Sequence, residues 1–126
     1  MGLTLIYRFL RISFALVWFV NGFYCKILGL VPRHEFIVAK ILGFDYAQQF
    51  THAIGFAEVI MGFWILSGYK AKLNAATQIV VVLLMNILET LIVPELLFWG
   101  SMNLLFAFIF VLLIFINEFI IAKRIT

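Results

Sequence analysis

The sequence predicts an all-α protein, a transmembrane four-helix bundle, and three observations lead to that class. Hydrophobic residues fill 66% of the 126 positions and charged residues only 12%, whereas soluble domains are about 45–50% apolar. Four apolar segments each approach the ~20 residues that a spanning helix needs. The alternating pattern of a membrane barrel is missing, and an open sheet would leave backbone groups unpaired in lipid. We therefore expect a single domain, 1–126, surrounded by the lipid bilayer.

The spanning helices are expected at about 5–28, 50–66, 75–93 and 102–122. Two of the three connections, 67–74 and 94–101, are short, which predicts antiparallel neighbours. The first connection is longer, and apolar residues recur in it at helical spacing between Pro32 and Gly43. Proline is common at a helix start and glycine just past its end. This segment is therefore predicted to form a short interfacial helix over the outer mouth of the bundle.

The basic residues predict an orientation. Four spans put both termini on one side, and that side carries six Lys and Arg residues against three on the other. The positive-inside rule then predicts cytoplasmic termini and an outward-facing first loop. We expect an integral protein of the bacterial cytoplasmic membrane. Because the basic residues flank helix ends and form no stripe, nucleic acid is not an expected partner.

Three charged side chains, Lys26, Glu58 and Glu89, lie inside the apolar segments. A charge at the bilayer centre costs at least ~2.5–3.5 kcal/mol, so such residues usually mark a site, a pathway or a buried pair. All three fall in the predicted outer half, whereas the inner half is almost bare apart from Gln78 and two residues near the inner ends, Asn117 and Glu118. The candidate ligand-binding or proton site consists of Trp18, Asn21, Lys26, His52, Glu58, Asn86, Glu89 and Asn103.

Helical spacing predicts which way these residues face. Residues three or four apart share a helix face, and polar or small residues in membrane helices face the bundle interior. Three such stripes are Gln78, Val82, Asn86, Glu89 and Val93; Gly55, Glu58 and Gly62; and Asn103, Ala107, Phe110, Ile114 and Asn117. The stripes are expected to converge inside the bundle.

Two interpretations of the convergence remain open. In the first, Lys26 pairs with Glu58 or Glu89, and the asparagines of the candidate site complete a hydrogen-bond network that only fixes the packing. In the second, two carboxylates facing one ammonium leave excess negative charge, so one glutamate holds a proton. A protonated carboxyl suits proton exchange or a hydrogen bond to a polar head such as that of a quinone.

The sequence predicts no metal site and no cofactor held within the chain. His52 stands six residues before Glu58, too far around a helix for a shared ligand, and adjacent His34 and Glu35 diverge. The Glu-x-x-His pairs of di-iron bundles are absent. The single cysteine, Cys25, excludes an intrachain disulfide and is expected to be a buried small side chain.

Three motifs carry a resemblance that covers essentially the whole chain. They are Trp18-x-x-Asn21-Gly22-x-x-x-Lys26, Gly55-Phe-Ala-Glu58-x-x-x-Gly62, and the segment holding Asn86, Glu89 and Pro94. In these motifs the chain resembles the DoxX-like family of small four-helix integral membrane proteins. The resemblance implies a four-helix bundle. The family is named after the small subunit of a thiosulfate:quinone oxidoreductase, other members resemble oxidoreductase partners, and distant relatives act as assembly chaperones for membrane receptors.

The expected function is a quinone- or lipid-ligand-binding, non-catalytic subunit of a membrane oxidoreductase system. Lys26, Glu58 and Glu89 would line the pocket, Trp18 and nearby Phe residues would form apolar walls, and a redox partner protein would supply electrons. The alternative is a non-enzymatic assembly factor or scaffold whose buried Lys/Glu network is structural. Catalytic residues are unknown. The phenylalanine-rich surface also permits a homodimer.

Overall fold

The fold is a bundle of membrane-spanning helices, as the sequence predicts. The computed structural model describes residues 2–30, 32–92 and 102–125, and in the last segment it describes side chains from Leu104 onward. The helices are α1 (Gly2–Phe19) with the π-helical η1 (Val20–Ile27), α2 (Pro32–Leu42), α3 (Ala47–Ser67), α4 (Ala71–Ile92), and α5 (Met102–Phe115) with the π-helical η3 (Ile116–Ile121) and α6 (Ala122–Ile125). Within these described ranges, four stretches are long and apolar enough to cross a membrane: Gly2–Ile27, Ala47–Ser67, Ala71–Ile92 and Leu104–Ile125.

The connection between α3 and α4 is shorter than predicted. Gly68 adopts a left-handed φ of 71° and ends α3, donating its N–H to the Ile65 carbonyl at 3.3 Å. Glycine reaches this conformation without steric cost, which is why it often follows a helix. Because α4 already begins at Ala71, Asn74 lies inside a helix and not in the predicted loop. The predicted loop at 94–101, Pro94 included, and the side chain of Asn103 lie outside the described residues.

The predicted short helix in the first connection is present as α2. It begins at Pro32 and ends at Leu42, directly before Gly43, whose φ is 108°. The Gly43 N–H donates to the Ala39 carbonyl at 2.8 Å and closes the last turn. Its location at the membrane interface stays a prediction.

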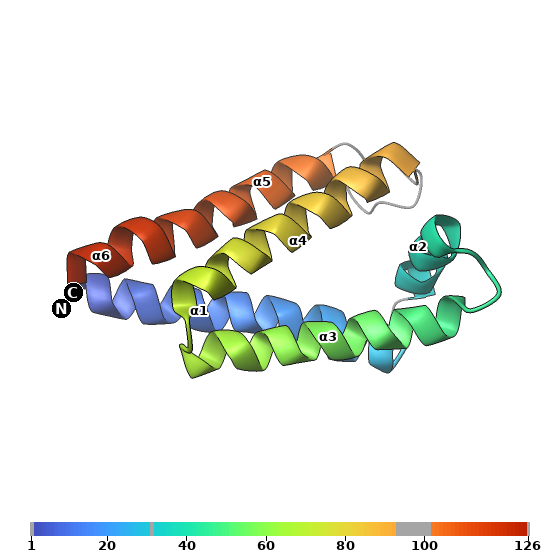
Figure 1. Cartoon of the computed structure of the whole chain (residues 1–126), viewed down its shortest axis with the longest axis horizontal. Helices are drawn as coiled ribbons and strands as arrows, with labels where there is room; N and C mark the ends of the chain where they lie inside the picture. The colour runs from blue at the N-terminus through green and yellow to red at the C-terminus, as the bar shows by residue number, and fades with distance from the viewer. Residues whose placement is uncertain (1, 31, 93–101, 126) are drawn as a thin grey trace.

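The long helices form two pairs that diverge along the bundle (Figure 1). In one pair α1 and η1 pack against α3, and in the other α4 packs against α5. The pairs meet at the end where both chain termini lie, here called the terminal end, and separate toward the opposite end, here called the α2 end. The buried apolar core occupies the converging half: Phe14, Ala15, Trp18, Met61, Ile65, Ala75 and Ile114. The diverging half is left with room between the pairs.

Glycines bring η1 and α3 into direct backbone contact. A Cβ added at Gly22 would lie 2.5 Å from the Gly55 carbonyl oxygen and 2.9 Å from the Glu58 Cβ. One added at Gly55 would lie 2.9 Å from the Lys26 Cβ. Only glycine fits at these positions, as is usual where membrane helices approach closely. The same contact brings the Lys26 and Glu58 side chains together.

Candidate functional site

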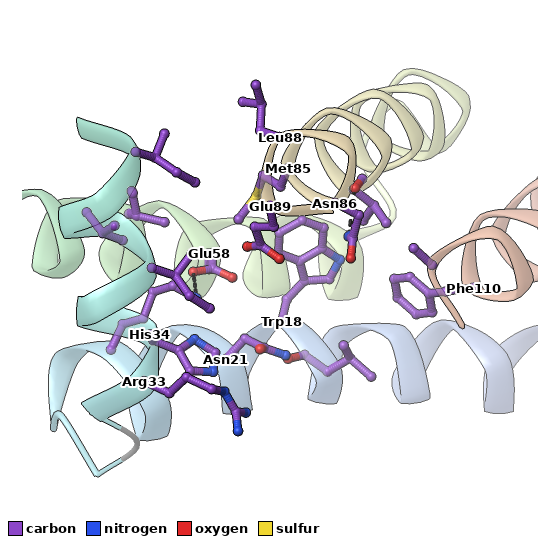
Figure 2. Close-up of a pocket in the computed structure, with 18 of the residues that line it drawn as sticks. Trp18, Asn21, Arg33, His34, Glu58, Met85, Asn86, Leu88, Glu89 and Phe110 are labelled. Atoms are coloured by element: carbon purple, nitrogen blue, oxygen red, sulfur yellow. Dashed lines mark hydrogen bonds and ion pairs between the residues drawn. The ribbon is translucent and has the colours of Figure 1, made fainter. Parts of the chain in front are cut away.

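A cavity of about 720 Å³ lies between the two helix pairs in the diverging half. Its walls come from α1, η1, α2, α4 and α5, while α3 contributes only Ile54 and Glu58. Ligand pockets typically measure about 300–1,000 Å³ and have mostly apolar walls with a few polar groups. Figure 2 shows Trp18, His34, Glu58 and Glu89 around a common space, each from a different helix.

Six of the eight residues proposed from the sequence line this cavity: Trp18, Asn21, Lys26, Glu58, Asn86 and Glu89. His52 lies on α3 outside the lining, and the Asn103 side chain is beyond the described part. The described members of the predicted stripes on α3, α4 and α5 face the interior, whereas Val93 and the Asn103 side chain lie outside the described residues. Gly55, Glu58 and Gly62 are buried, as are Gln78 and Ile114. The role of these residues in ligand binding stays a prediction.

Lys26 and Glu58 form a buried ion pair. Lys26 Nζ lies 2.8 Å from Glu58 Oε1, and the two side chains are 6% and 8% exposed. Of the two partners that the sequence left open, the ion-pair partner is therefore Glu58. Lys26 sits on η1, and such π-helical turns often occur at functional sites.

Glu89 is the carboxyl group left facing the cavity. It is half-buried on α4 and projects toward the space beside Trp18 and Glu58 (Figure 2). Among the described residues it makes neither a hydrogen bond nor an ion pair within 4.0 Å, in contrast to Glu58. Lys26 and Arg33 attract its charge from a greater distance. The Glu89 oxygens are thus available to a molecule in the cavity.

Asn21 and Asn86 each make a hydrogen bond within their own helix. Asn21 Nδ2 donates to the Val17 carbonyl, and Asn86 Nδ2 to the Val82 carbonyl, each at 2.8 Å. Each bond reaches back four residues along its own helix, a local alternative open to short polar side chains. The predicted network of Asn21, Asn86 and Asn103 stays a prediction, because the Asn103 side chain lies outside the described residues.

Sequence reasoning missed two polar residues, Arg33 and His34, which enter the cavity wall from α2. The pKa of His34 is lowered to about 4 by burial and by the neighbouring charges of Lys26 and Arg33. Its imidazole is therefore neutral near pH 7 and can both donate and accept a hydrogen bond. The overlooked signal is the spacing of His34 with Ile37 and Ile41, which share one helix face and line the same cavity.

The terminal half is more polar than predicted. Trp18 Nε1 donates to Gln78 Oε1 at 2.9 Å, and Gln78 Nε2 donates to Asn74 Oδ1 at 2.7 Å. Tyr7 also donates its hydroxyl to Glu118 Oε2 at 2.8 Å. The sequence named Gln78 and Glu118 as exceptions in this half, and the structure adds Asn74, Tyr7 and the Trp18 N–H, because Asn74 was expected in a loop and tyrosine and tryptophan donors were not counted. The bond to Gln78 also fixes the indole that walls the cavity.

These features define a small polytopic helical membrane protein with an internal cavity between two diverging helix pairs. In the described ranges no cluster of three metal-binding side chains occurs. A model of the DoxX-like family matches residues 15–116, and the chain belongs to this family. Comparison with curated proteins gave no match, and comparison with solved structures gave none either.

Proposed function

We propose that the protein binds a lipid-soluble amphiphile with a hydrogen-bonding head, such as a quinone, as a non-catalytic subunit of a membrane oxidoreductase system. One observation carries the proposal: a cavity of about 720 Å³ faced by a carboxyl group, Glu89, that has no hydrogen bond or ion pair in the described part. A scaffold would be expected to close its polar core into a sealed Lys–Glu network.

The distribution of polar groups fits an amphiphile. The charged side chains and His34 gather toward the α2 end, whereas Trp18, Ala107 and Phe110 line the cavity deeper in the bundle. A polar head would lie at the first group and an apolar tail along the second. The charged lining residues are two basic side chains, Lys26 and Arg33, and two carboxyls, Glu58 and Glu89.

A quinone carbonyl would accept a hydrogen bond from Lys26 or from a protonated Glu89. Lys26 keeps a charge-assisted donor although it is paired, because an ammonium has three N–H groups. Trp18 supplies a flat apolar wall, held in place by Gln78. A redox partner protein would supply the electrons. We also propose that both termini lie in the bacterial cytoplasm and that the cavity lies toward the outer side of the membrane. The distribution of basic residues supports this orientation.

The test is ligand extraction from protein purified gently from its native membrane. We expect mass spectrometry to find near-stoichiometric quinone with the wild type and to lose it with Glu89→Leu, which removes the hydrogen-bonding group. Glu35→Leu is the matched control, because Glu35 is exposed on α2 and does not line the cavity. If the wild-type protein carries no quinone and no other enriched amphiphile, the proposal is wrong and the scaffold is favoured.

A further inference from the structure

The helix pairing leaves one side of the cavity without a covering helix. α1 and η1 pack against α3, and α5 packs against α4. The short helix α2 packs against η1, α3 and α4. In the described ranges, therefore, no helix lies between η1 and α5 at the cavity's depth. α1 meets the α5 side of the bundle through η3 and α6 and through an edge-to-face contact of Phe14 with Phe110, whose ring centroids are 5.4 Å apart.

Two residues mark the edges of this side. Val17 on α1 and Phe106 on α5 both line the cavity, yet they are 43% and 44% exposed. A side chain that borders a cavity and is also open to the surroundings lies at the rim of an opening. Both residues belong to spanning stretches, Gly2–Ile27 and Leu104–Ile125. The surroundings at this rim are consequently the hydrocarbon of the bilayer and not water.

A second rim lies at the α2 end. Leu42 on α2 and Leu88 on α4 also line the cavity and are 53% and 36% exposed, so they too mark a rim of the cavity. A polar head bound near Glu89 would sit close to this rim. Its tail must then run along the apolar walls away from the charges, past Trp18, toward the side framed by Val17 and Phe106. Hydrocarbon is most stable when it stays out of water.

We infer that the opening between α1–η1 and α5, framed by Val17 and Phe106, admits the hydrocarbon tail of a bilayer amphiphile from the side. The head faces the charged residues at the α2 end, and the tail passes Trp18 and continues into the lipid. This inference rests on the proposed function for the presence of a ligand. It adds the route of access and the requirement for a long apolar tail.

Trp18 provides the reporter, because it lines the cavity and is only 5% exposed. A Trp64→Phe, Trp99→Phe background leaves Trp18 as the only indole. The protein is reconstituted in vesicles of phosphatidylcholine brominated at mid-chain, and its fluorescence is compared with that in unbrominated vesicles. Bromine quenches indole only at short range, so chains that enter the cavity quench Trp18.

Three phenylalanine substitutions separate the routes. Val17→Phe narrows the side opening, Leu42→Phe narrows the rim at the α2 end, and Leu16→Phe is the control, since Leu16 is 57% exposed and lies outside the cavity lining. We expect Val17→Phe to bring Trp18 fluorescence back toward its unbrominated level, Leu42→Phe to do so less, and Leu16→Phe to leave the quenching as in wild type. Circular dichroism verifies that each variant is folded.

The inference is overturned if Val17→Phe leaves the quenching unchanged, or if Leu42→Phe relieves it more. Its failure can be told from failure of the proposed function, because lipid itself is the probe. If the extract contains quinone but Val17→Phe does not change the quenching, quinone binding is supported and the side opening is rejected. Quenching that Val17→Phe relieves, without quinone in the extract, would keep the opening and reject quinone.

Discussion

Removing one partner of the Lys26–Glu58 pair is expected to destabilise the protein severely. At 2.8 Å, two unit charges attract by on the order of 6 kcal/mol at an effective dielectric constant of about 20. Desolvation offsets part of this attraction, and breaking a buried pair costs about 3–5 kcal/mol, because one charge is left buried and uncompensated. We expect Glu58→Gln to lower the free energy of unfolding by an amount in that range.

A double-mutant cycle isolates the pair from other effects of the substitutions. Glu58→Gln, Lys26→Met and the double variant are unfolded by titration with sodium dodecyl sulfate and followed by circular dichroism. The double variant is expected to be less destabilised than the sum of the two single variants, since it leaves no unpaired charge. Lys40→Met and Glu35→Gln are matched controls, because both residues are exposed on α2.

The reasoning is refuted if the single effects add within about 0.5 kcal/mol, the scatter expected of independent sites. Additivity would mean that the short contact does not hold η1 against α3. The reasoning is also refuted if the Glu58→Gln variant has the same free energy of unfolding as the wild type. In either case the close approach of Gly22 and Gly55 would be the interaction that positions the two helices.

Three further predictions concern the packing, the cavity wall and the buried polar chain. Gly22→Ala should lower the free energy of unfolding by about 1–3 kcal/mol through overpacking, while Gly2→Ala, with no atom within 4 Å of its added Cβ, should have no such effect in the same titration. His34 should titrate near pH 4 by nuclear magnetic resonance; since its pKa is lowered from 6.5 to about 4, the unfolded chain binds its proton first, and stability should fall as pH drops from about 6.5 toward 4. His34→Gln should remove that part of the pH dependence, and a His34 pKa near 6.5 would contradict the buried position. Gln78→Leu leaves the Trp18 indole N–H without its acceptor and should cost about 1–3 kcal/mol, together with a shift in Trp18 emission; unchanged stability and emission would show that the bond to Gln78 is dispensable.

The two halves of the bundle differ in how the space between the helix pairs is filled. In the terminal half, large side chains such as Phe14 and Ile114 fill the space where the helix pairs meet, and the polar groups there are largely paired with one another. In the other half the pairs diverge, and the polar groups face a cavity. The packed half and the half that holds the cavity thus lie at opposite ends of one bundle.

The sequence by itself determined the spans and the inward-facing residues. Both depend on local properties: the length of an apolar run sets whether a helix can cross the bilayer, and helical periodicity sets which residues share a face. For the same reason, Pro32 and Gly43 were enough to predict α2. The spacing of Gly55 and Glu58 likewise predicted a close helix contact beside a buried charge.

Only the tertiary structure decided which glutamate Lys26 meets and whether a cavity exists. The choice between Glu58 and Glu89 depends on how far apart the helix pairs stand, and the π-helical turn of η1 changes the direction in which Lys26 points. Asn21 donates a hydrogen bond to a carbonyl group of its own helix. Residue spacing alone does not distinguish such a local bond from a bond across the bundle. His34 became part of the wall because α2 folds back against η1, α3 and α4. These outcomes depend on distances between helices, and a pattern within one helix does not contain them.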